Sequence, residues 1–380
     1  MLSPTPLSLL CALLLCLPLA IVYTIISATI TTTYTDENPE TINLPRLNNT
    51  KNHQGTPFEP NTALPDDDES LFQVASRVNP IPCPQKLQPK KLAFMFLTNI
   101  PLPFAPLWEL YFNNQSSNTK TLFNIYIHAD PTYNYDPPFS GVFAHRVIPS
   151  KHTRRFTPTL ISAARRLLAH ALLDDPANAM FALISPSCIP IHSFDFTYKT
   201  VINSDKSFIE ILNNEVGEYD RWAARGEDVM LPEVKLEEFR IGSQFWILTR
   251  KHARLVVSDR KLWSKFKLPC VQWYTCYPEE NYFSTLLNMR DPLGCVPTTL
   301  THVDWRGRFD GHPRTYKASV VGPELIVWIR RRRPRYGHNG TNVSDLFVTE
   351  RHDPFLFARK FSFDSIRTLM SIANDVIFKN

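Results

Sequence analysis

The sequence predicts an α/β domain built on a mostly parallel sheet that helices flank. Short apolar runs typical of buried strands alternate with helical segments over residues 90–380. A stretch of this length can bury one sizeable core. Polar residues follow several of the predicted strands, at the edge where open α/β sheets bind their ligands. We expect a single transmembrane helix and a stem to precede this domain.

The first half of the domain carries the clearest periodic signals. Strands are predicted at residues 91–98, 122–128 and 179–185. A short helix is expected at 106–112, after the first strand. The strongest helix runs over 158–173, with Pro158 in its first turn and Thr157 able to cap it. Its apolar stripe comprises Leu160, Ile161, Ala164, Leu167, Leu168 and Ala171.

Two further strands, at 208–212 and 245–248, precede a helix at 250–257. Polar side chains occupy the carboxyl ends of the earlier strands. They are Asn99, then His128 with Asp130, and then Ser185 with Ser187. Residues at these positions either contact a ligand or cap a loop, and the pattern leaves both readings open.

The segment Pro278-Glu279-Glu280 places two acids at the predicted start of a helix. That helix would bury Tyr282, Phe283, Leu286 and Leu287. The two acids point about 100° apart on a helix, so at most one faces a cleft. Nearby aromatic residues would desolvate a carboxylate and raise its pKa, which suits a general base that accepts a proton from a hydroxyl. Alternatively, both acids only complement the helix N-terminus.

The N-terminal region predicts export. Residues 7–30 carry no charge and are long enough to cross a bilayer once, which favours a transmembrane signal anchor over a cleaved signal peptide. Residues 1–6 would form a short cytosolic tail, because acids rather than bases follow the span. Residues 31–89, rich in Thr, Asn, Pro and Asp, are predicted to form a stem, and 90–380 the lumenal domain.

Glycosylation motifs and cysteines agree with a lumenal domain. The acceptor pattern occurs at Asn48, Asn114, Asn339 and Asn342. Five cysteines follow the anchor, which allows two disulfides and one thiol: Cys83, Cys188, Cys270, Cys276 and Cys295. Cys270 and Cys276 are close enough to close a small loop before the acidic pair. Their spacing fits no common zinc pattern, so no metal site is expected.

Several function classes lack their usual motifs. The chain has no Gly-x-Gly-x-x-Gly, no Walker loop and no Gly-x-Ser-x-Gly, and it contains 11 glycines. Beyond the stem it has no Asp-x-Asp pair to hold a divalent ion, so a diphosphate would need protein cations such as Arg314, Arg359 or Lys360. The net charge of +5 is mild, and the basic run 330–335 indicates a solvated loop or a polyanion-facing edge rather than a nucleic-acid site.

Taken in order, several segments resemble one family. They are Ala93-Phe94-Met95-Phe96-Leu97-Thr98, Ile125-Tyr126-Ile127-His128, Arg165-Arg166-Leu167-Leu168, Ser185-Pro186-Ser187-Cys188, Gly242-Ser243-Gln244-Phe245, Tyr277-Pro278-Glu279-Glu280, Val303-Asp304-Trp305 and Leu356-Phe357-Ala358-Arg359-Lys360-Phe361. The chain resembles the core-2/I-branching β-1,6-N-acetylglucosaminyltransferase-like proteins, glycosyltransferase family 14, and especially their plant branch. The resemblance implies a type II Golgi membrane protein with a GT-A-like lumenal domain. It also implies inverting sugar transfer without a metal or other cofactor.

The resemblance also implies roles for individual residues. Glu280 matches the family's catalytic base, and Lys360 and Arg314 match cations that stabilise a departing UDP. His128 and Asp130 match the strand end that meets the uridine. Contacts to the acceptor would fall on Glu210, Arg221 and Trp305. The implied substrates are a UDP-sugar, carrying N-acetylglucosamine or glucuronic acid, and a hydroxyl of a glycan or glycoprotein acceptor, with no nucleic-acid partner.

Two positions depart from the plant pattern. Arg155-Phe156 stands where many relatives carry Trp-Gly, and Ala164 stands where they carry Glu. Both lie in the segment expected near the donor, so the donor sugar stays open. The alternative to an enzyme is a catalytically silent lumenal protein of the same fold that binds glycans or acts as a scaffold.

Overall fold

The computed structural model describes residues 64–81, 89–113, 121–308, 312–337 and 353–379. These residues belong to one compact unit, which spans Ala63–Asn380. The predicted anchor, Cys83 and the four candidate glycosylation sites Asn48, Asn114, Asn339 and Asn342 lie outside the described residues. Within the described ranges, no helix combines the length and the apolar character needed to cross a membrane.

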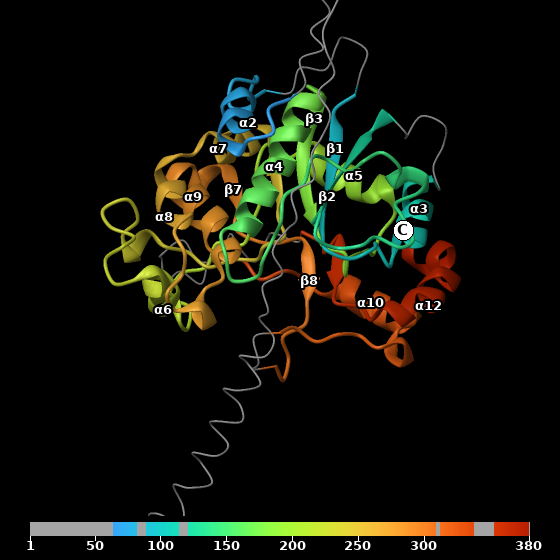
Figure 1. Cartoon of the computed structure of the whole chain (residues 1–380). Helices are drawn as coiled ribbons and strands as arrows, with labels where there is room; N and C mark the ends of the chain where they lie inside the picture. Colours follow the sequence, from blue (N-terminus) through green and yellow to red (C-terminus); the bar gives the residue numbers. More distant parts are fainter. Residues whose placement is uncertain (1–63, 82–88, 114–120, 309–311, 338–352, 380) are drawn as a thin grey trace, which may run out of the picture. The chain divides into compact units, whose positions relative to one another are not determined.

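A six-stranded sheet forms the centre of the unit, in the order β2-β1-β3-β6-β5-β7 (Figure 1). Its strands are β1 (Lys91–Thr98), β2 (Phe123–Ala129), β3 (Asn178–Ile184), β5 (Ser207–Phe208), β6 (Ile247–Thr249) and β7 (Cys295–Val296). The pairs β1–β2, β1–β3 and β5–β7 are parallel, whereas β6 runs antiparallel to both of its neighbours. The predicted mostly parallel α/β sheet is therefore confirmed.

A second sheet of three short strands was not predicted. It comprises β4 (Ile189–Pro190), β9 (Phe357–Arg359) and β8 (Thr301–Val303), in the order β4-β9-β8. β9 pairs antiparallel with β4 and parallel with β8, and Val303 lies opposite Arg359. The sheet thus fixes the C-terminal segment beside the loop that follows β3.

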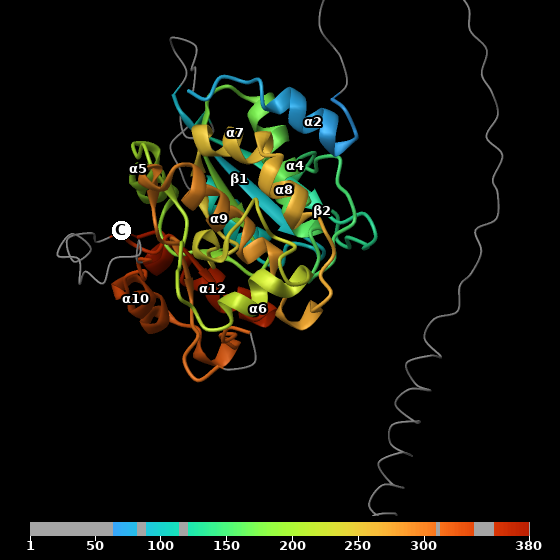
Figure 2. The same cartoon turned by 90° about the vertical axis from the view of Figure 1, so that its left-hand side faces the viewer.

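Helices cover both faces of the central sheet (Figures 1 and 2). The core on one face includes α2 (Asp68–Ala75), α4 (Thr159–Asp174), α7 (Arg250–Ser258), α8 (Lys261–Phe266) and α9 (Tyr282–Arg290). The core on the other face includes α3 (Ala105–Asn113), α5 (Phe194–Ile202), α10 (Pro323–Arg331) and α12 (Ile366–Ser371). A short helix, α6 (Glu218–Trp222), adds Trp222 to the first core.

The predicted central helix is confirmed as α4, with a later start and deeper burial than its pattern indicates. It begins at Thr159 after Pro158, and the Thr157 hydroxyl accepts from the Thr159 amide at 3.4 Å. Burial extends beyond the apolar stripe to Arg165 and Arg166, which are 1% and 0% exposed. The Arg166 side chain donates to the Pro149 carbonyl from Nε at 3.1 Å and from Nη2 at 2.8 Å.

The boundary predicted for the stem is wrong for its last part. Residues 68–75 form α2, which buries Leu71, Phe72 and Ala75 against α4 and α7. The Asp67 carboxylate accepts from the Ser70 amide at 2.8 Å and caps this helix. An acidic run that resembles a solvated linker is therefore a helix start. Arg254 also donates to the Ser76 carbonyl at 2.8 Å, which holds the end of α2 to the domain.

The packing of α2 leads to a first prediction. Phe72→Ala should lower the free energy of unfolding by about 3 kcal/mol, because it leaves a cavity in the core and removes a ring that lies 4.4 Å from the Arg165 guanidinium carbon. Val74→Ala, on the exposed side of the same helix, should change stability by less than about 0.5 kcal/mol. Chemical denaturation of both variants measures the difference. Equal free energies of unfolding for the two variants would mean that α2 belongs to the stem and does not pack into the domain core.

Candidate active site

Two cavities meet at the carboxyl-terminal edge of the central sheet. The first, here called the strand-end cavity, has a volume of about 690 Å³. Its wall includes Thr98 at the end of β1 with Asn99 after it, Ser185 and Ser187 after β3, and the segment 152–155 before α4. The strand ends singled out in the sequence therefore border a cavity, as the architecture predicts.

The second cavity, here called the Glu210 cavity, has a volume of about 530 Å³. Its charged lining residues are Glu210, Glu215, Arg221, Glu280, Arg335 and Arg359. Five residues line both cavities, namely Gln244, Tyr277, Glu280, Trp305 and Arg359. The wall between the cavities is thus the place where a ligand in one could meet a ligand in the other.

Glu280 lies in this shared wall and is held there by local structure. Residues Pro278–Glu280 form a single 3₁₀ turn, and α9 begins only at Tyr282, two residues beyond the predicted acidic pair. A disulfide between Cys270 and Cys276 closes the preceding loop, a pairing that their spacing allows. Arg221 on α6 forms an ion pair with Glu280, Nη1 to Oε2, at 2.9 Å. Its guanidinium carbon also lies 4.7 Å from the Tyr277 ring centroid.

A close backbone approach brings the two sides of the Glu210 cavity together. The Gly242 amide donates to the Glu280 carbonyl at 2.8 Å. A Cβ at position 242 would lie 2.1 Å from the Glu210 carbonyl oxygen, so only glycine fits there. Glu210 and Glu280, which are far apart in the sequence, consequently line one cavity.

Glu279 has a different environment from its neighbour. It is 8% exposed, and it lines the strand-end cavity but not the Glu210 cavity. Burial raises the pKa of Glu279 to about 7, and the charge of Glu280 acts in the same direction. Its Oε2 atom has no hydrogen-bond partner among the described residues. The raised pKa expected for an acid of this motif therefore falls on Glu279.

Two predicted donor contacts lie behind the cavity wall. His128 is fully buried, burial lowers its pKa to about 4, and its Nε2 accepts from the Lys151 amide at 3.2 Å. Burial would raise the pKa of Asp130, but hydrogen bonds from Thr132 and Thr153 outweigh it and lower that pKa. Neither residue lines the strand-end cavity, whereas His152 and Thr153 do. His128 and Asp130 thus hold the loop that lines the cavity instead of facing it.

The predicted cations differ in position. Lys360 lines the strand-end cavity, and Arg359 lines both cavities with its guanidinium carbon 4.6 Å from the Phe245 ring centroid. Arg314 is exposed and is not a lining residue, although the preceding His312 and Pro313 are. Arg154 also lines this cavity and was not predicted; its position in the loop that leads into the central helix was the available signal.

The predicted acceptor contacts all lie at the Glu210 cavity. Burial raises the pKa of Glu210 to about 7, while Arg335 opposes the shift. Arg335 forms an ion pair with Glu215 at 2.6 Å. Trp305 is 52% exposed, so its ring is available to a ligand from either cavity. Glu210, Arg221 and Trp305, which lie far apart in the sequence, therefore share one lining.

Of the two departures from the plant pattern, Arg155-Phe156 lies at the candidate site and Ala164 lies in the core. Arg155 lines the strand-end cavity and stacks on the Phe156 ring, with its guanidinium carbon 5.2 Å from the centroid. Phe156 packs edge-on against Trp273 and Tyr277, at centroid distances of 5.9 and 5.4 Å. Ala164 is buried in the core and lines neither cavity.

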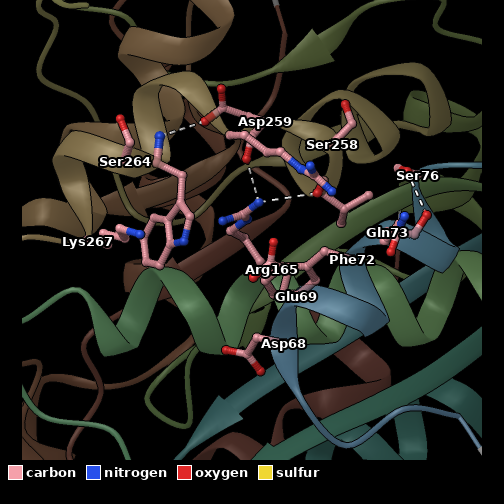
Figure 3. A pocket seen from close by; sticks show the side chains of 13 residues that line it. Asp68, Glu69, Phe72, Gln73, Ser76, Arg165, Ser258, Asp259, Ser264 and Lys267 are labelled. Atoms are coloured by element: carbon pink, nitrogen blue, oxygen red, sulfur yellow. Dashed lines mark hydrogen bonds between the residues drawn. The ribbon is translucent and has the colours of Figure 1, made fainter.

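Another cavity, of about 230 Å³, lies between α2 and α8. Figure 3 shows its polar groups, of which Arg165 donates to the carbonyls of Val257 at 3.2 Å and Asp259 at 2.8 Å. The Asp259 carboxylate in turn accepts from the Leu262 and Trp263 amides at the start of α8. These groups satisfy helix ends, so we place the candidate active site at the other two cavities.

Glu279 leads to a second prediction, on the pH dependence of stability. Its pKa rises from 4.5 to about 7 on folding, so the native state binds the proton more tightly and loses stability as pH increases across that window. Glu279→Gln should remove this loss and stabilise the protein at pH 8 by about 3 kcal/mol at most. Glu237→Gln, at an exposed position, is the matched control. Thermal unfolding between pH 4 and pH 8 measures the slopes, and an unchanged slope in Glu279→Gln would contradict the assignment.

Comparisons with known proteins show which family the chain belongs to. The family model for the Core-2/I-Branching enzyme matches residues 92–330. Glycosyltransferase BC10 from Oryza sativa subsp. japonica is 31% identical over 308 residues, which cover 72% of this chain and 74% of that protein. Among solved structures, a galactosyltransferase LgtC complex with donor and acceptor sugar analogs is matched at 8% identity and a TM-score of 0.34, covering 76% of this chain and 97% of that one. On the family match and the rice relative, the chain belongs to the Core-2/I-branching enzyme family of glycosyltransferases.

Proposed function

We propose that the protein is an inverting glycosyltransferase of GT-A-like fold that moves a sugar from a UDP-sugar to a hydroxyl of an acceptor glycan. The observation that carries this proposal is the position of Glu280 in the wall shared by two cavities. A transferase needs one site for each substrate and a base where they meet. The two cavities and Glu280 supply these three parts.

The strand-end cavity is the proposed donor site. It lies at the carboxyl ends of β1 and β3, where ligands of open α/β sheets bind. Arg154, Arg155, Arg359 and Lys360 line it and would offset the charge of a diphosphate. Arg314 stays a candidate for the same role from the loop after His312 and Pro313. Its exposed position makes Lys360 the stronger assignment.

The Glu210 cavity is the proposed acceptor site. Its lining offers carboxyl oxygens, guanidinium groups and the Trp305 ring, which are the groups that hydrogen-bond and stack with sugars. Glu280 would take the proton of an acceptor hydroxyl as that oxygen attacks the anomeric carbon from the side opposite UDP. One bond to the sugar forms while its bond to the diphosphate breaks, which inverts the configuration. Arg221, paired with Glu280, would keep the base oriented.

Metal independence is part of the proposal. The consecutive aspartates Asp66, Asp67 and Asp68 have other partners, since Asp67 caps α2, Asp66 pairs with Arg166, and Asp68 pairs with Arg166 and Lys151. Within the part of the chain that the structure describes, no three His, Cys, Asp or Glu side chains gather as metal ligands would. Lys360 and Arg359 would therefore stabilise the leaving UDP in place of a divalent ion.

The proposal includes the cellular setting. An anchor at residues 7–30 would make the chain a type II Golgi membrane protein with a lumenal catalytic domain, and the Cys270–Cys276 disulfide supports an oxidising compartment. Both N-acetylglucosamine and glucuronic acid are candidate donor sugars. Arg155 and Arg154 in the donor cavity are the residues to vary when the donor is determined.

Glu280→Gln is the decisive test of the base. We expect it to lower sugar transfer by about 10²-fold to 10⁴-fold, because the amide cannot accept the acceptor proton. Folding and UDP binding should persist, as Gln keeps the shape of the side chain. Glu237→Gln removes one exposed carboxylate away from both cavities and should leave transfer unchanged. Normal transfer by Glu280→Gln would exclude it as the base, and no transfer by the unmodified protein with any UDP-sugar would favour the silent binding protein.

A fourth prediction concerns divalent ions. UDP should raise the thermal stability of the protein in excess EDTA, because a ligand that binds only the native state stabilises it by mass action. Lys360→Ala should reduce this shift, since it removes a cation from the strand-end cavity. Differential scanning fluorimetry with and without added manganese measures the effect. A UDP shift that appears only with manganese would overturn the metal-independent mechanism.

A further inference from the structure

The basic run at residues 330–335 is not explained by sugar transfer, and its members have different surroundings. Arg330 is structural, because it donates to the carbonyls of Ile191, Ile377 and Lys379 near the C-terminus. Arg335 pairs with Glu215 at the Glu210 cavity. Arg331, Arg332 and Arg333, between them, are exposed at the end of α10.

These exposed arginines join a second segment through one aromatic ring. The guanidinium carbons of Arg332 and Arg306 each lie 4.4 Å from the Trp328 ring centroid. Arg306 is oriented by Asp304, to which its Nη2 donates at 2.8 Å. We call Arg306, Arg331, Arg332 and Arg333, together with Trp328, the arginine track. Among the described residues, no carboxylate forms an ion pair with Arg331, Arg332 or Arg333.

The track is continuous with the Glu210 cavity along two stretches of chain. Arg306 directly follows Trp305, which lines that cavity. Arg333 directly precedes Pro334 and Arg335, which line it as well. A ligand that leaves the cavity past Trp305 or past Pro334 therefore meets the guanidinium groups of the track.

A structural role accounts for only part of this cluster. Basic side chains at a helix C-terminus complement its dipole, and Arg333 donates to the carbonyls of Arg330 and Arg332 at 2.9 and 3.0 Å. Among the described residues, no such hydrogen bond is formed by Arg331, and the guanidinium group of Arg332 lies over the Trp328 ring. Helix capping therefore does not account for the exposed guanidinium groups of Arg331 and Arg332.

We propose that the arginine track binds an acidic glycan, so that the acceptor is a polysaccharide chain bearing carboxylate groups beyond the sugar that is modified. Guanidinium groups bind carboxylates through paired hydrogen bonds, and several in a row favour a chain with repeated negative charges. A linear glycan can also enter the Glu210 cavity at one end and follow the track with the rest. The inference rests on the proposed function only for the identity of that cavity as the acceptor site.

Binding of the full chain to polygalacturonate, measured at increasing NaCl concentrations, tests the proposal, with neutral galactan as the reference polymer. Arg331→Gln combined with Arg332→Gln should weaken polygalacturonate binding about tenfold and reduce its salt dependence. The Lys replacements at the same two positions keep the charge but lose the paired hydrogen bonds, so their binding should fall between that of the Gln variant and that of the unmodified protein. Arg260→Gln combined with Lys267→Gln removes the same charge at α8, which lies apart from α10 in both views (Figures 1 and 2), and should leave binding unchanged.

Three results would overturn the proposal. The first is equal weakening by the α10 and α8 variants, which would reduce the effect to net charge. The second is equal binding of galactan and polygalacturonate. The third is binding to phosphatidylserine vesicles without binding to polygalacturonate, which would make the track a membrane contact. The binding assay does not depend on sugar transfer. If the arginine track binds polygalacturonate but the protein transfers no sugar, the proposed function is refuted and the proposed glycan binding is not.

Discussion

The structure depends on the burial of β1 on both faces. Seven of its eight residues are buried, and the side chains alternate between two cores: Ala93, Met95 and Leu97 face one, and Leu92, Phe94 and Phe96 face the other. A strand with no polar face needs helices on both sides of the sheet. Polar groups and loops are thereby confined to the strand ends. The strand-end cavity lies there, lined by Thr98 at the end of β1 and by Ser185 after β3.

Elements whose signal is local in the sequence were predicted correctly, whereas elements that depend on contacts between distant segments were missed. The strand Lys91–Thr98 was predicted with the bounds that the structure has, because its whole signal is a local apolar run. The three-stranded sheet was missed because its strands are two or three residues long and pair with segments far away in the chain. α2 was missed because its acidic start resembles a linker, and only tertiary contacts make its apolar face visible.

In the candidate site, too, the surroundings of single side chains depend on contacts that the sequence does not reveal. The strand-end rule pointed to the edge of the sheet where the strand-end cavity lies, but it could not tell that His128 and Asp130 turn inward to hold the loop 151–153. Motif order alone made Glu280 the candidate base, whereas its pairing with Arg221 is visible only in the folded chain. Similarly, both acids line the strand-end cavity, but only Glu280 also lines the Glu210 cavity, a difference that the 3₁₀ turn sets. Two adjacent acids thus acquire different environments, which is how one motif can supply two chemical properties.

The pair Arg155-Phe156 combines a strained backbone conformation with side chains that lie at or beside the wall of the site. Phe156 has φ of 62°, a left-handed conformation in which glycine is favoured and a bulky residue costs of order 1 kcal/mol or more. The ring contacts with Trp273 and Tyr277 offset this cost, since edge-on aromatic pairs stabilise by about 0.5–1.5 kcal/mol each. Tyr277 in turn contacts Arg221, the partner of Glu280. Phe156 therefore supports the Glu280 wall from outside, and Arg155, stacked on its ring, adds a cation to the strand-end cavity. Losing the Phe156 ring would leave the backbone without this packing and Arg155 without the ring on which it stacks, so we regard the pair as one structural unit of the proposed donor site.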